Sequence, residues 1–359
     1  ARVSAAEVPD ARGAVPDAVP DAVPDAVTGT PPAAPLPTVT AVVPTYKRRD
    51  GLEAAVRALL GDPGTTELVV VVDGSPDGSL ELLQGIAAED PRLRPVWQEN
   101  AGGAAARQAG IDLATGDVVL LVDDDVVAAP GLSSGHARHH ALADDLVVLG
   151  YMPTRVPVDL VRGGFATRVY AEEYEGTCRA YERDPDQVLL RLWGGNVSVR
   201  RDRLAGVPYD SGPFSRTNHS DRDWGIRLRK AGLRGVFDRS LLASHEHSRP
   251  LPAFLRDARA QGAGRYGVHV LHADVLPPFG LDDTVADLPA PLRGVLGLDR
   301  YRVARAGLVG GLQAVTRTAS RAGVSRVEVP AAKLLRRLAM RDGVRQAMAA
   351  PPPGSAGSA

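Results

Sequence analysis

Short apolar runs alternate with amphipathic stretches along the first half of the chain. The apolar runs are continuous and of strand length, which is typical of strands buried on both faces of a sheet. They cover residues 38–43, 68–72 and 118–122, and helical patterns lie between and beside them at 51–60, 79–88 and 103–114. This alternation predicts a parallel α/β sheet with right-handed crossovers. Ligands of such sheets bind beyond the carboxyl ends of the strands.

The pattern after residue 150 is looser and mainly helical. It predicts a turn and strand at 193–200, and helices at 165–180, 220–231, 251–266 and within 299–349. Residues 1–38 contain a Val-Pro-Asp-Ala repeat, and proline at every fourth position blocks helix formation. We therefore expect five parts: a disordered tail at 1–38, an α/β half at 39–150, a second half at 151–250, a helical extension at 251–350 and a disordered tail at 351–359.

Composition excludes several classes of protein. The 359 residues suffice for about two domains, and the formal net charge of −1 argues against nucleic acid as a partner. The single cysteine, Cys178, excludes an intramolecular disulfide and a zinc site built from cysteines. The N-terminal residues lack the apolar core of a secretory signal, and no stretch resembles the roughly 20 apolar residues of a membrane-spanning helix. We expect a soluble, cytoplasmic protein.

The net charge is near zero, although two parts of the chain carry opposite charges. Residues 299–359 carry 11 Lys+Arg and 3 Asp+Glu, whereas residues 1–38 carry 2 Arg and 5 Asp+Glu. Three interpretations of the basic region stay open: peripheral contact with an anionic membrane surface, contact with an acidic partner, or a helix kept soluble by its charges. The last is the simplest.

Three consecutive carboxylates, Asp123, Asp124 and Asp125, directly follow the apolar run at 118–122. Like charges at the end of a buried strand repel one another, and a hard divalent cation such as Mg²⁺ or Mn²⁺ would compensate them. In an extended strand Asp123 and Asp125 would point the same way and Asp124 the opposite way. A second carboxylate, Asp73, follows the run at 68–72 and begins the turn-like sequence Asp-Gly-Ser-Pro-Asp-Gly.

Four motifs in a fixed order resemble the family 2 glycosyltransferases of the GT-A fold. They are Val-Val-Pro-Thr-Tyr at 42–46, Val-Val-Asp-Gly-Ser-Pro-Asp-Gly at 71–78, Asn-Ala-Gly-Gly-Ala at 100–104, and Gly-Asp at 116–117 leading to the acidic triplet. The resemblance spans about residues 38–250. It implies a Rossmann-like, parallel-rich sheet and an inverting enzyme that uses nucleotide-diphosphate sugars. The QxxRW motif of processive synthases is missing.

The resemblance also implies a role for each matching residue. Asp221 occupies the position of the catalytic base. A divalent cation, Mn²⁺ or Mg²⁺, would be held by Asp123, Asp125 and His245. The nucleotide would be bound by Pro44, Thr45, Tyr46, Asp73, Arg107 and Asp124. The acceptor would be bound by Gly195, Asn196, Asp223 and Trp224.

Structural explanations compete with several of these roles. Ser220 and Asp223 have the spacing of a helix capping box, so Asp223 has an explanation as a purely structural residue. Asp221 falls in the first turn of the same helix, where the dipole favours the ionised carboxylate that a general base requires. His136 and His140 have the i, i+4 spacing of metal ligands, but no nearby carboxylate completes such a site, so a solvated helix face is expected.

The sequence thus predicts metal-dependent, single-displacement transfer of a sugar from a nucleotide-diphosphate donor to an acceptor hydroxyl. The acceptor, whether small molecule, glycan or lipid-linked, is not identified. Two alternatives stay open: a sugar-phosphate nucleotidyltransferase, and a non-catalytic module that binds sugar nucleotides.

Overall fold

Eight strands form one sheet within the part of the chain that the structure describes. The computed structural model describes residues 35–155, 164–210, 214, 219–245 and 248–350. The strands are β1 Val39–Thr45, β2 Thr65–Asp73, β3 Leu93–Gln98, β4 Val118–Val122, β5 Val126–Ala128, β6 Leu146–Tyr151, β7 Asn196–Arg200 and β8 Arg234–His245. Their order across the sheet is β3-β2-β1-β4-β7-β6-β8-β5. Nearly all of the two predicted tails lies outside the described residues.

The first four strands are parallel, as the alternating pattern predicts. β1 pairs in parallel with both β2 and β4, and β2 pairs in parallel with β3. β7 differs because it is antiparallel to both of its neighbours, β4 and β6. Its first residue, Asn196, therefore lies opposite Val122, the last residue of β4. The antiparallel strand thus brings the residues just before Asn196 to the edge where the parallel strands end.

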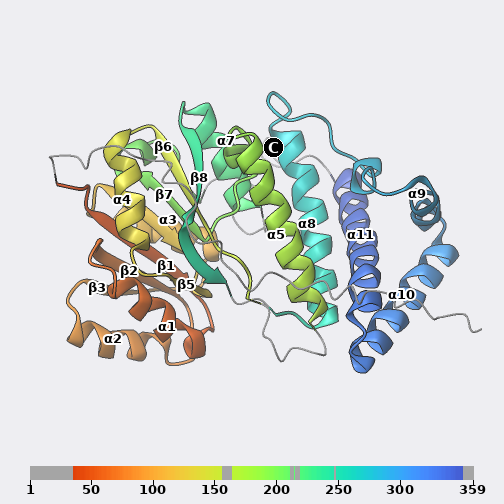
Figure 1. Cartoon of the computed structure of the whole chain (residues 1–359), viewed down its shortest axis with the longest axis horizontal. Coiled ribbons are helices and arrows are strands. Elements are labelled where there is room, and N and C mark those ends of the chain that lie inside the picture. Colours follow the sequence, from red (N-terminus) through yellow and green to blue (C-terminus); the bar gives the residue numbers. More distant parts are fainter. Residues whose placement is uncertain (1–34, 156–163, 211–213, 215–218, 246–247, 351–359) are drawn as a thin grey trace, which may run out of the picture. The chain divides into compact units, whose positions relative to one another are not determined.

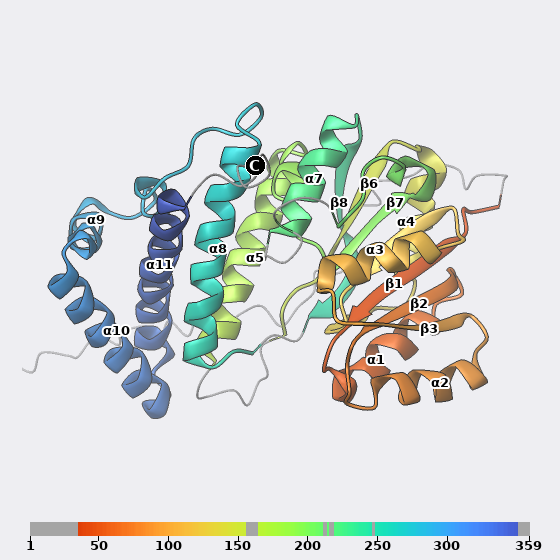
Figure 2. The ribbon, with the colours of Figure 1, turned by 180° about the vertical axis from the view of Figure 1, so that it is seen from behind.

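Helices cover both faces of the sheet (Figure 1, Figure 2). They are α1 Arg49–Leu60, α2 Ser79–Glu89, α3 Gly103–Leu113, α4 Leu132–Leu142, α5 Phe165–Arg183, α6 Gln187–Leu190, α7 Ser220–Lys230, α8 Leu251–Leu271, α9 Ala290–Gly297, α10 Arg302–Ala322 and α11 Ser325–Ala349. Side chains of α1, α2 and α4 pack with strand residues in one buried cluster, and side chains of α3, α6 and α7 pack in another. The predicted α/β sheet flanked by helices is confirmed.

The C-terminal part is helical, also as predicted. Figure 1 shows α5, α8 and α11 side by side, and they share an apolar cluster that includes Phe165, Phe254 and Leu335. α10 packs along α11 through a further cluster. No helix in the described part of the chain is both long and apolar enough to cross a membrane.

The histidines of α4 contradict the expectation of a solvated helix face. His136 is 0% exposed and His140 is 3% exposed. His136 contacts Ser198 Oγ at 2.7 Å and Asn196 Oδ1 at 2.9 Å through its two ring nitrogens, and His140 Nε2 contacts the same Ser198 hydroxyl at 2.8 Å. Burial lowers the pKa of His136 to about 3, so its ring is neutral at pH 7. These histidines form a polar network inside the core, and they do not form a metal site.

α8 and α11 approach each other closely at two glycines. A Cβ atom on Gly262 would lie 2.1 Å from the carbonyl oxygen of Met340, and one on Gly343 would lie 1.9 Å from the carbonyl oxygen of Arg259. Backbone atoms cannot turn aside as a flexible side chain can, so a larger residue at either position must push the helices apart.

We expect Gly343→Ala to lower the free energy of unfolding by about 1–3 kcal/mol, the usual cost of overpacking a core. The matched control is Gly310→Ala in α10, where a Cβ atom would meet nothing within 4 Å. Because alanine favours a helix over glycine, this control should be neutral or stabilising by up to about 1 kcal/mol. Urea unfolding of both variants measures the difference. Equal stabilities would contradict the close contact between α8 and α11.

Candidate active site

Residues from distant parts of the sequence meet at one edge of the sheet. The parallel strands β1, β2 and β4 end there, at Thr45, Asp73 and Val122. The last residue of β8, His245, reaches the same region because it pairs with Val126 of β5, one residue beyond the acidic triplet. This is the edge at which ligands bind in α/β sheets.

The acidic triplet forms a turn, which corrects the expectation of an extended strand. The amide of Val126 donates to the carbonyl oxygen of Asp123 at 3.1 Å, so the chain reverses between β4 and β5. Arg48 therefore reaches two consecutive carboxylates: its guanidinium pairs with Asp125, and its Nε lies 3.6 Å from Asp124 Oδ1. Burial, together with the neighbouring Asp125 charge, raises the pKa of Asp124 to about 6 despite Arg48. The turn concentrates negative charge that a cation would relieve.

His245 lies beside this turn, as the sequence predicts. It is 6% exposed, and its Nε2 is 3.5 Å from Asp125 Oδ1. Carboxylate oxygens and an imidazole nitrogen are suitable ligands for Mn²⁺. In the described residues, however, no three His, Cys, Asp or Glu side chains are gathered tightly enough to form a metal site. Asp123 and Asp125 each contact an arginine, so those guanidinium groups supply the positive charge in this conformation. His247 lies outside the described residues.

Arg107 and Gly195 determine where the Asp123 carboxylate lies. Arg107 reaches from α3 and forms an ion pair with Asp123, and its guanidinium carbon lies 5.6 Å from the centre of the Tyr209 ring. A Cβ atom on Gly195 would lie 2.7 Å from Asp123 Oδ2, and its φ of +105° disfavours other residues. Gly195 therefore makes room for the Asp123 carboxylate.

Asp221 contacts Gly194, the residue before Gly195. Its Oδ2 accepts the amide N–H of Gly194 at 2.8 Å, and its Oδ1 accepts the amide N–H of Arg222 at 2.8 Å. Burial raises the pKa of Asp221, although these two hydrogen bonds and Arg107 act in the opposite direction. The expectation from the helix dipole alone was an unhindered ionised carboxylate. The structure instead shows a carboxylate whose proton affinity is increased, as suits a general base.

The Asp73 carboxylate accepts hydrogen bonds from the loop between β3 and α3. Its Oδ1 accepts Gln98 Nε2 and the amide of Ala101, both at 2.8 Å, and its Oδ2 accepts the amide of Gly102 at 2.9 Å. Asp73 thereby fixes the turn that begins α3, the helix that carries Arg107. Its predicted contact with the nucleotide stays a prediction, and its position supports an additional role in orienting α3.

The three residues at the end of β1 differ in their exposure. Pro44 and Thr45 are buried, and Tyr46 is 45% exposed with Lys47 Nζ lying 4.9 Å from the centre of its ring. The Thr45 hydroxyl is buried beside Asp124. Tyr46 is therefore the one of these three that offers a surface for stacking.

The residues predicted to bind the acceptor are buried in this structure, and their role stays a prediction. Asn196 is 0% exposed and donates Nδ2 to the Leu241 carbonyl at 3.0 Å while facing His136. Asp223 is 2% exposed and contacts Arg227 Nε at 2.9 Å and His272 Nε2 at 2.8 Å. Trp224 is 1% exposed within the core. Gly195 is buried as well, and it lies at the edge of the sheet against the Asp123 carboxylate.

The capping box predicted for α7 is absent. The N-cap residue of this helix is His219, which makes no capping hydrogen bond with its side chain. The His219 Nε2 instead lies 2.9 Å from the carbonyl oxygen of Gln261 in α8. The start of α7 is therefore held by contact with α8.

Two residues near the site had not been predicted to belong to it. Arg48 belongs to the basic run that follows β1, and this run was the available signal. Tyr170 in α5 accepts the indole N–H of Trp193 at 3.0 Å, and its ring centre lies 5.1 Å from that of His245. No sequence motif marks Tyr170, because only the packing of α5 brings it to this position.

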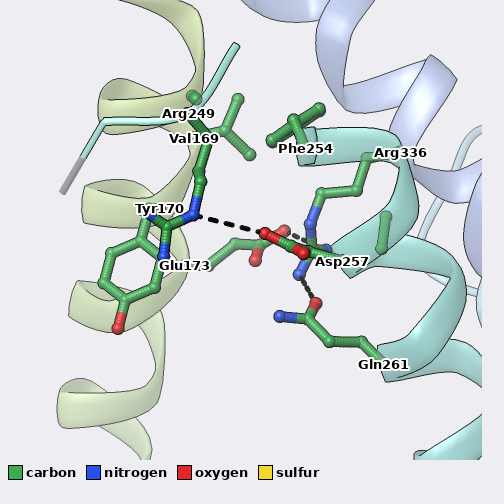
Figure 3. A pocket seen from close by; sticks show the side chains of 10 residues that line it. Val169, Tyr170, Glu173, Arg249, Phe254, Asp257, Gln261 and Arg336 are labelled. Carbon is green, nitrogen blue, oxygen red and sulfur yellow. Dashed lines mark hydrogen bonds and ion pairs between the residues drawn. The ribbon is translucent and has the colours of Figure 1, made fainter. Parts of the chain in front are cut away.

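A small cavity of about 50 Å³ lies between α5, α8 and α11 (Figure 3). Its charged side chains point toward one another: Arg249 lies 3.4 Å from Asp257, and Arg336 lies 2.6 Å from Glu173. These ion pairs already satisfy charged side chains that line the cavity, and no lining group points to a bound sugar. We therefore do not assign the acceptor to it.

The arrangement of the sheet and of the carboxylates at its edge is that of a GT-A glycosyltransferase. A solved structure supports this fold: the mannosyltransferase PcManGT from Pyrobaculum calidifontis, in complex with GDP-Man and Mn²⁺. It matches with a TM-score of 0.55 and 18% sequence identity, over 87% of this chain and 89% of that chain. The predicted GT-A fold is confirmed.

Sequence comparison finds the same family in part of the chain. The family model described as Glycosyl transferase family 2 matches residues 40–204. The uncharacterized glycosyltransferase YfnE of Bacillus subtilis is 22% identical over 69% of this chain and 77% of its own length. YibD of Escherichia coli, also an uncharacterized glycosyltransferase, is 33% identical over 31% of this chain and 32% of its own length. The stretch at residues 40–204 therefore matches the family 2 glycosyltransferases, as its motifs predict, and both relatives are named as glycosyltransferases.

Proposed function

We propose that the chain transfers a sugar from a nucleotide-diphosphate donor to an acceptor hydroxyl with inversion, in one displacement. The observation that carries this proposal is the pair of carboxylates on either side of Gly194 and Gly195. Asp221 accepts the Gly194 amide, and Asp123 lies against Gly195. A base on one side and a diphosphate site on the other suit an in-line attack at the anomeric carbon.

The proposal gives a role to three residues at the edge of the sheet. Asp221 accepts the proton of the acceptor hydroxyl, and its raised pKa increases its affinity for that proton. Arg107, released from Asp123, faces the donor diphosphate as a hydrogen-bond donor. Tyr46 offers its exposed ring to the nucleotide base. Holding both substrates in one geometry supplies much of the remaining acceleration.

The divalent cation is part of the proposal. Asp123 and Asp125 would hold it, with His245 beside them, after their arginine partners turn to the donor phosphates. A Mn²⁺ or Mg²⁺ ion bound there would act as a Lewis acid on the diphosphate. The PcManGT complex, with its GDP-Man and Mn²⁺, gives this proposal support from a protein of the same fold.

A thermal-shift screen tests the donor assignment. A ligand that binds only the folded state raises the melting temperature by mass action. We expect one of UDP, GDP, dTDP and CDP to stabilise the full chain in Mn²⁺, and the matching nucleotide sugar to release nucleoside diphosphate once the acceptor is supplied. Release of pyrophosphate would indicate a nucleotidyltransferase. Binding without turnover of any donor would favour a non-catalytic module.

The basic C-terminal region carries less free charge than its sequence suggests. Six of its basic side chains form ion pairs within the fold. Arg317, Arg321 and Arg326 are exposed and have no ion-pair partner among the described residues. Each is adjacent in sequence to a residue that lines an apolar groove of about 450 Å³ between α10 and the start of α11, where Val315, Val324 and Val327 are exposed. Arginines beside exposed apolar side chains suit an anionic membrane surface.

We expect the chain to sediment with vesicles of phosphatidylglycerol but not of phosphatidylcholine, and to be released as salt rises. Exchanging Arg317 and Arg321 together for Glu should abolish the effect. Arg138→Glu, at an exposed position of α4, is the control and should not change it. Equal pelleting with both kinds of vesicle, or with neither, would contradict this role.

A further inference from the structure

Three arginines converge near Asp221 from three different elements. Arg222 lies in the first turn of α7, Arg265 lies in α8, and Arg191 directly follows α6. Two hydrogen bonds of Arg222 connect these elements. Its Nε donates to the carbonyl oxygen of Leu190 at 2.9 Å, the residue before Arg191. Its Nη2 donates to His269 Nε2 at 3.1 Å, one helical turn after Arg265.

Aromatic packing holds Arg265 in the same place. Its guanidinium carbon lies 4.3 Å from the centre of the Phe279 ring, and the His269 ring centre lies 5.0 Å from that same ring. Arg222 and Arg265 therefore flank one His269–Phe279 pair. Burial, together with the charges of Arg265 and Arg191, lowers the pKa of Arg222 to about 10.

Neutral groups, not carboxylates, accept the hydrogen bonds of this cluster. His269 Nδ1 lies 2.7 Å from the carbonyl oxygen of Pro277, so it carries the proton and leaves Nε2 to accept from Arg222. The Arg265 Nε is buried without a hydrogen-bond partner, and neither Arg191 nor Arg265 has an ion pair within the described residues. Asp283 and Glu173 attract Arg265 without forming an ion pair with it; Asp283 accepts the amide of Gly280 at 2.7 Å, and Glu173 pairs with Arg336.

Two neighbouring arginines, by contrast, have carboxylate partners. Arg336 has Glu173 at 2.6 Å, and Arg249 has Asp257 at 3.4 Å (Figure 3). Partly burying cations without counter-ions costs stability, so a fold under no other constraint would be expected to pair or replace them. Guanidinium groups in this situation are well suited to bind a phosphate or carboxylate with paired hydrogen bonds.

We propose that Arg191, Arg222 and Arg265 form an anion-binding subsite beside Asp221, which holds a phosphate or carboxylate group of the acceptor. This inference rests on the proposed function, because it takes Asp221 as the base that meets the acceptor. The donor diphosphate has its own cation in Arg107 and its own site at the acidic triplet. The subsite therefore selects acceptors that carry a negative charge near the reacting hydroxyl.

Titrations of the full chain with glucose 6-phosphate, glucuronate and glucose test this subsite. Each is run without and with saturating nucleoside diphosphate and Mn²⁺. We expect at least one of the two anions to bind more tightly than glucose in both conditions, and the tighter of them identifies phosphate or carboxylate as the preferred group. Arg265→Gln should weaken anion binding about tenfold or more, as is typical when a hydrogen bond to a charged group is lost. Arg265→Lys should retain part of it.

Controls separate this inference from the proposed function. Arg256→Gln removes an exposed arginine from the same helix and should leave anion binding unchanged. Arg191→Gln, at an exposed position with no side-chain partner among the residues that the structure describes, provides a second test if Arg265→Gln does not fold. Nucleoside diphosphate should bind every arginine variant normally, and its failure to bind even the unaltered chain would count against the proposed function alone. The subsite is overturned if glucose binds as tightly as the anions, if the Gln variants bind like the unaltered chain, or if nucleoside diphosphate displaces the anion.

Discussion

We expect Asp221→Asn to lower turnover by about 10²–10⁴-fold, the usual contribution of a general base. Asparagine keeps the size of the side chain and one oxygen that can accept the Gly194 amide at the position of Asp221 Oδ2. It cannot take the proton of the acceptor hydroxyl. Donor binding should therefore stay near that of the unaltered chain. The measurement is a single-turnover rate at saturating donor, with donor affinity determined separately.

The matched control lies two residues further along α7. Asp223 is buried between Arg227 and His272, so Asp223→Asn should break a buried charged contact and lower stability, by about 3–5 kcal/mol if the pair behaves like other buried pairs. Turnover per folded molecule should change little. If Asp221→Asn retained the original rate while Asp223→Asn lost it, the base would be Asp223 and the proposed geometry would be wrong.

The raised pKa of Asp221 predicts a particular dependence of turnover on pH. Burial raises the pKa of Asp221, and the base acts only when it is deprotonated. Turnover should therefore fall on the acidic side at a pH above that expected for an ordinary carboxyl group. Asp221→Asn should remove this acidic limb from the profile of its residual activity.

The positions of the acidic triplet and of Asp73 could be predicted from sequence, because continuous apolar strands fix where the following residues lie. The run at 118–122 is buried on both faces, so the next three residues had to emerge at the edge of the sheet. The same reasoning predicted the position of Asp73, which is the last residue of β2. The direction of β7 could not be predicted, because antiparallel pairing with β4 depends on the whole sheet.

Burial of polar residues was the main source of error. His136, Asn196 and Ser198 satisfy one another inside the core, although His136 and Ser198 are 62 residues apart in sequence. A helix sequence viewed alone shows polar side chains and cannot show partners that arrive from a distant strand. The basic C-terminal helices posed the same problem, since Arg336 and Lys333 find their carboxylates on α5. Residue type indicates charge, whereas only the packed structure shows which charges remain free.

Replacing Asp125 by Asn should weaken nucleoside diphosphate binding in Mn²⁺ by about 10–100-fold, the range expected when contacts to a charged group are lost. Asp125 is next to His245 and is paired with Arg48, so it is placed to exchange that arginine for a cation when the diphosphate arrives. Binding of the nucleoside without phosphate or metal should change little, because the nucleoside carries no group that needs the carboxylate.

Asp117→Asn is the matched control, since Asp117 immediately precedes β4 at its other end and hydrogen-bonds Thr38. Calorimetric titrations of the three proteins, with and without Mn²⁺, make the comparison. Equal loss of diphosphate and nucleoside binding in Asp125→Asn would show that the carboxylate only supports the turn, and an unchanged affinity would remove Asp125 from the donor site.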